Sequence, residues 1–141
     1  MKTLTNRFKI AENFSLHEFQ NKEGLVMVHP ALVEGLQAAR DEMNDGHEEY
    51  FIVVTNSIRT EADNAALGAR LGWTDEGGLV ARDSRHLTKY GGIAADISVR
   101  RILNRPVNRA MVLQVLNKHF DYVKADYADG HIHVDQRFRA R

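Results

Sequence analysis

The chain has 141 residues, 43% of them hydrophobic and 27% charged, and its nineteen basic residues balance nineteen acidic ones. This length suits one domain, because two halves would each be too small to bury a self-sufficient core. The balanced charge argues against a nucleic-acid partner, and no stretch approaches the roughly 20 apolar residues of a membrane span. We therefore expect residues 1–141 to form one domain without stable membrane insertion.

The chain contains no cysteine, which excludes disulfides and thiolate nucleophiles and leaves His, Asp and Glu as the plausible transition-metal ligands. The first nineteen residues lack the uninterrupted apolar run and small-residue cleavage site of a secretory signal. We therefore expect synthesis and initial retention in the cytoplasm. The sequence leaves the oligomeric state open, with a monomer as the working expectation.

The N-terminal third predicts two helices. Ser15 and Glu18 have the spacing of a capping box, which predicts a short helix over residues 15–21. Apolar residues then recur at spacings of three and four from Pro30, a residue suited to a helix start, as far as Gly46. This stripe predicts a longer helix that faces the core.

The middle of the chain predicts a strand, a helix and a long loop. The run YFIVVT at residues 50–55 is β-branched and aromatic, which favours a buried strand. Good helix formers between Thr60 and Leu71 precede a glycine, which predicts a helix with a C-terminal stop. Residues 72–92 hold five of the ten glycines without a regular apolar period and are expected to form a loop of functional importance.

The C-terminal third predicts a strand over residues 93–99, a helix over residues 106–119, and strands over residues 122–127 and 131–137. The last two are separated by three residues, which suits a hairpin. Strands and helices do not alternate regularly. The expected fold is therefore α+β, with a small, mainly antiparallel sheet flanked by helices.

The segment HIHVDQ combines two histidines and an aspartate at alternate positions. In a strand, His131, His133 and Asp135 would share one face, with Ile132 and Val134 on the other. Such a pair of imidazoles on a surface strand is more often ordinary polar decoration than a site. The motif alone is therefore weak evidence.

A second cluster, SRHLTKYGGIAADI at residues 84–97, places a loop histidine, His86, before a strand that contains Asp96. Packing explains this aspartate poorly, because an unpaired buried carboxylate costs several kcal/mol. A cation would satisfy it, and a salt bridge to a nearby arginine is the alternative.

The two clusters together supply the ligand set of a catalytic zinc ion. Such sites use three protein ligands and leave a position for water, and His86, Asp96 and His133 are three residues of suitable type. Hydrolysis also needs a proton acceptor beside that water. His131 is the best-placed candidate base, and Asp129 is the alternative.

The order Ser-x-His, Gly-x-Ala-Ala-Asp-Ile and His-Val-Asp resembles the family of zinc D-alanyl-D-alanine carboxypeptidases. Three further segments are similar to segments that occur in the same order in its small single-domain members: FSLHEFQ, PALVEGLQAARDEM and VTNSIRTEADNAALGA, at residues 14–20, 30–43 and 54–69. The resemblance covers most of the chain. It implies a hedgehog/DD-peptidase-like fold and hydrolysis of an amide bond in peptidoglycan peptides.

The resemblance also implies roles for individual residues. The family's three zinc ligands correspond to the His, Asp and His named above, and its substrate-binding arginine corresponds to Arg59. A guanidinium can grip a peptide carboxylate or steady a carbonyl oxygen as charge develops; otherwise Arg59 would be a solvated turn residue. Ser84 and Asn64 match further motif positions and are candidate substrate-binding residues.

The chain departs from the family pattern at two places. Three extra residues lie between Thr88 and Gly92, and they lengthen the segment between the first two ligands. A loop can absorb them, because the entropy of loop closure grows slowly with length. Residues 54–59 also lack the family's glycine and aromatic residue, which leaves the substrate preference open.

Three hypotheses follow. The first is a zinc peptidase, either a D,D-carboxypeptidase or an endopeptidase, which resembles phage endolysins that reach the wall with a partner membrane protein or in the virion. The second is a wall-peptide-binding module with a structural zinc, which a fourth protein ligand, or a His131 turned away, would favour. The third is a metal-free protein whose histidines are incidental.

Overall fold

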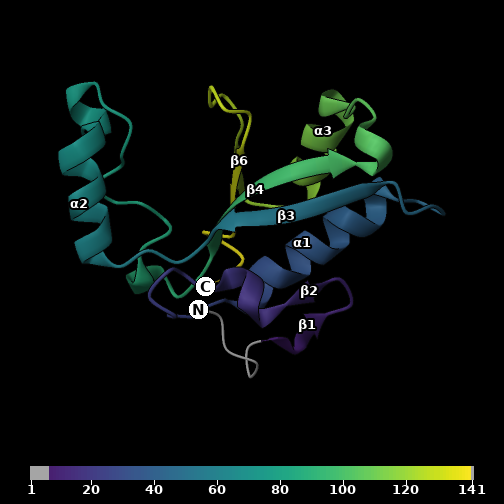
Figure 1. The fold of residues 1–141 in the computed structure, drawn as a ribbon, viewed down its shortest axis with the longest axis horizontal. Coiled ribbons are helices and arrows are strands. Elements are labelled where there is room, and N and C mark those ends of the chain that lie inside the picture. The colour runs from purple at the N-terminus through teal and green to yellow at the C-terminus, as the bar shows by residue number, and fades with distance from the viewer. Residues whose placement is uncertain (1–6, 141) are drawn as a thin grey trace.

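The computed structural model describes residues 7–140, and a four-stranded antiparallel sheet lies at its centre (Figure 1). The strand order is β3-β4-β6-β5. Their bounds are β3 Tyr50–Asn56, β4 Ala94–Arg101, β5 Tyr122–Lys124 and β6 Ile132–Asp135. A separate pair joins β1 (Lys9–Ala11) to β2 (Phe14–Ser15). The predicted α+β class with small antiparallel sheets is confirmed.

Three α-helices accompany the sheet in the described residues: α1 Pro30–Met43, α2 Glu61–Leu71 and α3 Arg109–His119. Helices α1 and α3 pack against each other, and their apolar stripes meet one face of the sheet. The largest fully buried core side chains include Leu32, Leu36, Ile97, Leu116 and Ile132. Each such burial contributes roughly 1.5–3 kcal/mol.

Helix α2 stands apart from this core, on the other side of the molecule from α3 (Figure 1). Its buried residues are Asn64 and Gly68, and its alanines are mostly exposed. The Trp73 ring lies so close to Gly68 that an added Cβ would come within 2.2 Å of it, which makes glycine a requirement there. The helix is therefore held to its own following loop and not by a broad apolar face.

Several predicted element boundaries are confirmed. Helix α1 begins at Pro30 as predicted and ends at Met43. Thr60 caps α2 by accepting the backbone N–H of Asp63, and Gly72, at φ +81°, ends that helix. Pro30 and Gly72 therefore indicated the start of α1 and the end of α2 correctly.

Other boundaries were wrong in detail. The helix predicted from Pro106 begins at Arg109, because the side chain of Asn108 accepts the Met111 N–H and acts as the cap. The helix predicted over residues 15–21 is a single 3₁₀ turn, Leu16–Phe19, although its capping box is present. The C-terminal hairpin is present with shorter strands, so its connector spans residues 125–131 instead of three residues.

Residues 72–92 form the predicted long loop, interrupted by two 3₁₀ turns at Thr74–Glu76 and Thr88–Tyr90. The second turn contains two of the three extra residues noted in the sequence, and the third, Gly91, ends it. Its Tyr90 hydroxyl donates to Asp83 at 2.5 Å, so the inserted segment is tied back to the residues that precede His86. None of the helices in residues 7–140 has the length and apolar character needed to cross a membrane.

Candidate metal centre

Two of the predicted ligands lie side by side on neighbouring strands. Asp96 of β4 and His133 of β6 are register partners in the antiparallel ladder. Alternation places Ala95, Ile97 and Val134 on the core face, so Asp96 and His133 occupy the face that α1 and α3 leave uncovered. The Asp96 Oδ1 and His133 Nδ1 atoms are 3.4 Å apart.

The third predicted ligand, His86, reaches the same point from the long loop. The Arg59 N–H donates to the His86 carbonyl at 2.8 Å, and the Thr88 N–H donates to the Arg59 carbonyl at 3.1 Å. These two bonds join the loop to the segment after β3. They bring the His86 Nε2 atom to 3.1 Å from Asp96 Oδ1 and 3.1 Å from His133 Nδ1.

The outer nitrogen of each imidazole has a hydrogen-bond acceptor. His86 Nδ1 lies 2.5 Å from the Ser57 carbonyl, and His133 Nε2 lies 2.8 Å from the Asp135 carboxylate. Since an N–H must face each acceptor, the other nitrogen of each neutral ring presents its lone pair inward. Two lone pairs and one carboxylate oxygen thus converge, and only a cation or a shared proton relieves their repulsion.

This arrangement could hold a metal ion. The ligand atoms of His86, Asp96 and His133 all lie within 4.8 Å of one another. Both histidines are buried, and the Asp96 side chain is 15% exposed. Outward N–H bonds to a carbonyl and a carboxylate are the support that metal-bound histidines usually have. The predicted cluster is therefore brought together, although the donor set alone does not identify the metal.

Asp135 holds His133 in place and was given no role in the sequence analysis. Its side chain is fully buried, and Arg137 donates to both of its oxygens, from Nε at 2.9 Å and from Nη2 at 2.8 Å. Burial alone would raise the pKa of Asp135, but Arg137 and His133 hold it at about 2. The alternation in HIHVDQ was a usable signal for this residue. The Ser57 carbonyl, a backbone atom, left no signal in the sequence.

The electrostatics at the centre favour positive charge. Burial pushes the pKa of Asp96 upward, but hydrogen bonds with His133 and His86 outweigh it and hold the pKa well below its usual range. Burial lowers the pKa of His133, and the carboxylates of Asp135 and Asp96 more than offset it, so the pKa is raised. The carboxylates that attract a proton here would also attract a metal cation, which competes with that proton.

His131 lies just outside β6, because its backbone N–H donates to the Asp129 side chain at 3.1 Å instead of joining the ladder. Its imidazole still faces the cluster, with Nε2 4.0 Å from Asp96 Oδ1. Its Nδ1 lies 2.5 Å from Asp129 Oδ1. The two residues weighed as alternative bases are thus hydrogen-bonded to each other, with His131 nearer the cluster.

The other predicted site residues have internal partners. The Arg59 Nη1 donates to Asn64 Oδ1 at 3.1 Å, and the Asn64 amide donates to the Ala81 carbonyl at 3.1 Å. The Ser84 hydroxyl accepts the His86 N–H at 3.2 Å. Burial lowers the pKa of Arg59, and the Asp96 charge opposes that shift. In this structure Asn64 therefore orients Arg59, and Ser84 supports the loop that carries His86.

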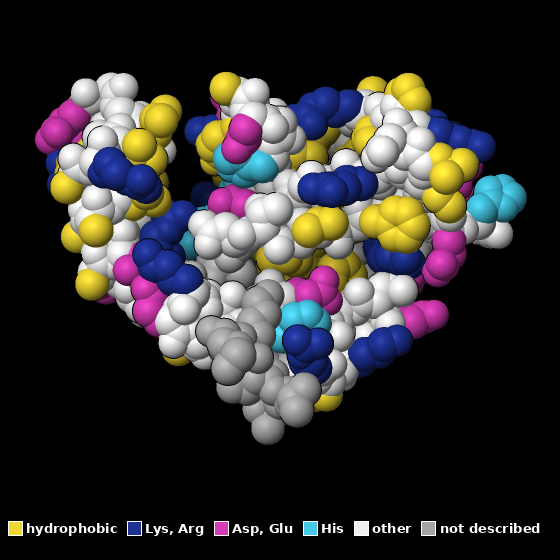
Figure 2. Space-filling view, viewed as in Figure 1, with side chains coloured by type: hydrophobic (Ala, Val, Ile, Leu, Met, Phe, Trp, Pro, Cys, Tyr) yellow, Lys and Arg dark blue, Asp and Glu magenta, His cyan; other side chains and the backbone are white. Residues whose placement is uncertain are grey.

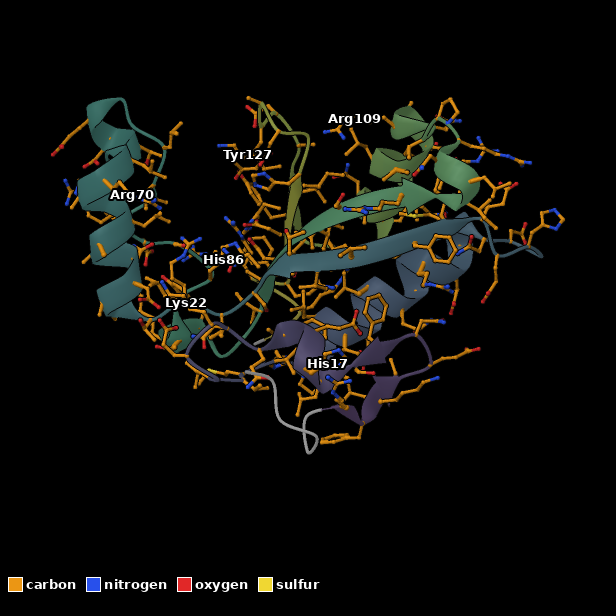
Figure 3. All side chains as sticks on the ribbon, viewed as in Figure 1. His17, Lys22, Arg70, His86, Arg109 and Tyr127 are labelled. Carbon is orange, nitrogen blue, oxygen red and sulfur yellow. The ribbon has the colours of Figure 1, made fainter. Side chains whose placement is uncertain are left out.

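A polar cleft of about 620 Å³ lies against the segment that carries Ser57 and Arg59. Its other walls are Glu18, residues 20–23 and one face of α2, which contributes Asp63, Leu67 and Arg70. Figure 2 shows the molecule deeply hollowed between α2 and the rest of the chain, and Figure 3 shows Lys22, Arg70 and His86 around this region. None of His86, Asp96 and His133 lines the cleft, but its wall includes Ser57, whose carbonyl is the hydrogen-bond partner of His86.

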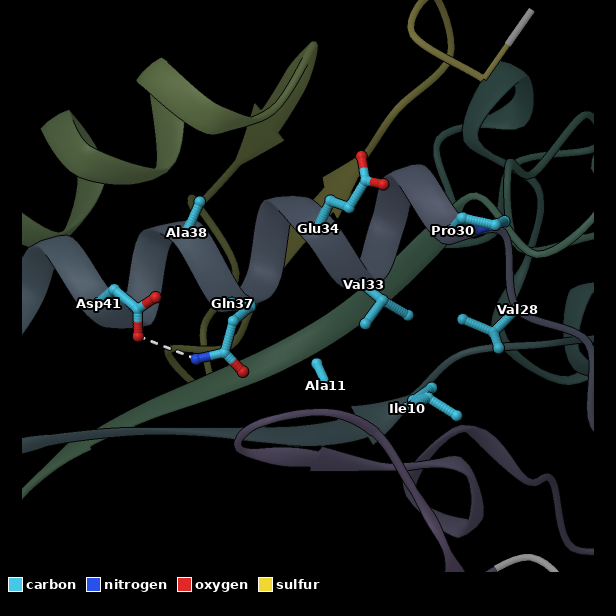
Figure 4. Close-up of a pocket in the computed structure, with 9 residues that line it drawn as sticks. All are labelled: Ile10, Ala11, Val28, Pro30, Val33, Glu34, Gln37, Ala38 and Asp41. Atoms are coloured by element: carbon cyan, nitrogen blue, oxygen red, sulfur yellow. Dashed lines mark hydrogen bonds between the residues drawn. The ribbon is translucent and has the colours of Figure 1, made fainter.

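A second hollow, of about 550 Å³, lies between β1 and α1 (Figure 4). Its lining is largely apolar, including Ile10, Val28 and Val33, and it contains none of the three metal-centre residues. Its two carboxylates, Glu34 and Asp41, both belong to α1, and no histidine lines it. Of the predicted site residues, Arg59 lines the polar cleft and none lines this second hollow.

No protein-family model, no curated protein and no solved structure matches the chain. The resemblance noted in the sequence thus remains a prediction.

Proposed function

We propose that this protein is a zinc-dependent hydrolase that cuts an amide bond in the stem peptides of bacterial peptidoglycan. The observation that carries the proposal is the convergence of His86, Asp96 and His133, with the outer N–H groups of both imidazoles already bonded. Three ligands of this type are the usual set of a catalytic zinc. The sequence resemblance supplies the substrate class and the hedgehog/DD-peptidase-like fold, both as parts of the proposal.

A bound zinc ion would supply Lewis acidity, which polarises a carbonyl and lowers the pKa of water to about 7. The residues of the chain would do the remaining work. His131 Nε2, free of the Asp129 bond, faces the centre and would accept the proton of the attacking water. Arg59, held by Asn64 beside the cleft, would grip a substrate carboxylate or carbonyl oxygen.

The alternative is a wall-peptide-binding module on the same fold, in which the zinc is structural. Structural zinc sites are closed by four protein ligands, whereas the described residues bring three into one group. His131 stands near enough to face the centre without belonging to that group. Both features favour the hydrolase. The proposed hydrolase would act on the cell wall, which it would reach by phage-type release or from the virion.

The test incubates the zinc-loaded protein with purified peptidoglycan and identifies the released fragments by mass. Wild-type protein should release amino acids or peptides, and His131→Ala should slow release by about 10²–10⁴-fold, the usual contribution of a general base. His119→Ala is the matched control, because His119 ends α3 and pairs with Glu42 of α1, and it belongs to none of the groups described above. Bound peptidoglycan with no released fragment would favour the binding module, and neither binding nor release would refute both.

A further inference from the structure

The β5–β6 connector, residues 125–131, is a tightly organised turn. The Gly130 N–H donates to the Tyr127 carbonyl at 3.1 Å, and Gly130 adopts φ +83°, which a residue with a side chain rarely tolerates. This turn returns the chain so that the rings of Tyr127 and His131 stack, with centroids 3.9 Å apart and planes 19° from parallel. The ring of His131, the candidate base, is thus stacked on the ring of Tyr127.

Arg109, the first residue of α3, fastens the connector from outside. Its Nη2 donates to the Ala125 carbonyl at 2.7 Å, and its Nη1 donates to the Gly130 carbonyl at 3.3 Å. Figure 3 shows this side chain extending from α3 towards the connector, which also carries Tyr127. One planar guanidinium therefore joins the two sides of the turn, which the single ammonium of a lysine cannot do with the same geometry.

The His131 imidazole is constrained on three sides. Asp129 holds Nδ1, Tyr127 covers one ring face, and Nε2 points towards Asp96. Rotation of the ring would break the Asp129 bond and the stack together. Burial raises the pKa of Tyr127 to about 12, so this supporting ring stays an uncharged phenol at neutral pH.

We propose that Tyr127 and Arg109 are positioning residues that hold the His131 imidazole against the metal centre. Arg109 bonds to backbone carbonyls of the connector and Tyr127 stacks on His131, so their effect on the metal-centre side chains would pass through the connector and the His131 ring. The catalytic consequence rests on the proposed function. The structural consequence, a single orientation and tautomer of His131, does not.

The experiment compares Tyr127→Leu, Tyr127→Phe and Arg109→Lys in the zinc-loaded protein. Tyr127→Leu and Arg109→Lys should lower kcat about tenfold, because a misplacement of about 1 Å can cost up to 10²-fold, and should leave KM within about twofold. Tyr127→Phe keeps the stack and should behave as wild type. Arg105→Lys is the control for a surface arginine, since Arg105 pairs with Glu49 away from the connector.

Nitrogen NMR of the labelled histidine rings supplies the second readout. Wild type, Tyr127→Phe and Arg105→Lys should show His131 as one species protonated at Nδ1, whereas Tyr127→Leu and Arg109→Lys should show a mixture of tautomers. Unchanged His131 signals in both disruptive variants would overturn the proposal. If Arg109→Lys fails to fold, the Tyr127 pair decides alone. A wild type without hydrolytic activity would refute the proposed function, while the ring spectra would still decide the positioning role.

Discussion

The candidate metal centre combines a pair of strands with a loop, and the two regions hold their candidate ligands in different ways. Asp96 and His133 are placed by the β4–β6 ladder, whose hydrogen bonds fix both their separation and their common face. His86 is placed by a loop that meets the rest of the chain through a few backbone bonds, chiefly with Arg59. A strand pair thus supplies two ligands from its register, while a loop must be fastened to supply one.

The groups that support these ligands differ in the same way. On the strand side, His133 is supported by Asp135, which is also bonded to Arg137. The Asp135 side chain is fully inaccessible to solvent. Around the His86 loop, the bond from Tyr90 to Asp83 is exposed, with an Asp83 side chain that is 59% accessible. Hydrogen bonds in water are weaker than buried ones, so we expect the strand side to depend more strongly on its support.

The largest effect should follow loss of a strand ligand. A structural zinc ion in a peptide is held by roughly 10–16 kcal/mol in total, so removing one of three ligands should cost about 4 kcal/mol, or about a thousandfold in affinity. We therefore expect His133→Ala to lose tight zinc binding. Competition with a chromophoric chelator measures the affinity, and metal analysis after dialysis measures the content.

The control for this variant is His119→Ala, which removes a histidine that contacts Glu42. It should bind about one zinc per chain, as a three-ligand site requires. Equal zinc content in wild type and His133→Ala would exclude the metal centre. Absence of zinc from wild type, with no loss of thermal stability in chelator, would favour a protein whose histidines are incidental.

A smaller effect should follow from weakening the support behind His133. Asp135→Asn keeps the shape of the side chain and removes the charge that holds the His133 Nε2–H. Changes of this kind typically cost 10–100-fold in metal affinity. Competition with the chromophoric chelator measures the zinc affinity of this variant, and circular dichroism checks its folding. Asp75→Asn, which alters an exposed partner of Arg82, is the matched control; a wild-type affinity in Asp135→Asn would show that the ring needs no such support.

The sequence predicted the strand side of the site better than the loop side. Alternation in HIHVDQ correctly separated His133 and Asp135 from Ile132 and Val134, because side-chain direction in a strand is a local property. The register of Asp96 with His133 depends on pairing between distant segments, and local pattern does not determine it. The Ser57 carbonyl and the Arg59–His86 backbone bonds were also invisible, since any residue could supply those atoms.

Hydrogen bonds from short polar side chains to nearby backbone groups explain why the predicted starts of β6 and α3 were misplaced. The strand predicted from His131 begins one residue later, because the Asp129 side chain takes the His131 N–H. The last predicted helix begins three residues after Pro106, because Asn108 caps it. In both cases a short polar side chain bonds to nearby backbone and displaces a regular element. Composition and periodicity indicated where the elements lie but not these terminal bonds.

The smallest effect should come from the exposed support of the loop. Tyr90→Phe removes the hydroxyl that donates to Asp83 and keeps the ring, over which the Arg85 guanidinium lies at 4.5 Å. A solvent-exposed hydrogen bond contributes about 0.5 kcal/mol or less to the loop's order, so zinc affinity should fall no more than about threefold. The same chelator competition measures this, and amide exchange over residues 84–92 should report the loosened loop more clearly than the affinity does. A loss as large as that of Asp135→Asn would mean that the inserted turn controls the position of His86, and that the loop, not the strand pair, limits the strength of the centre.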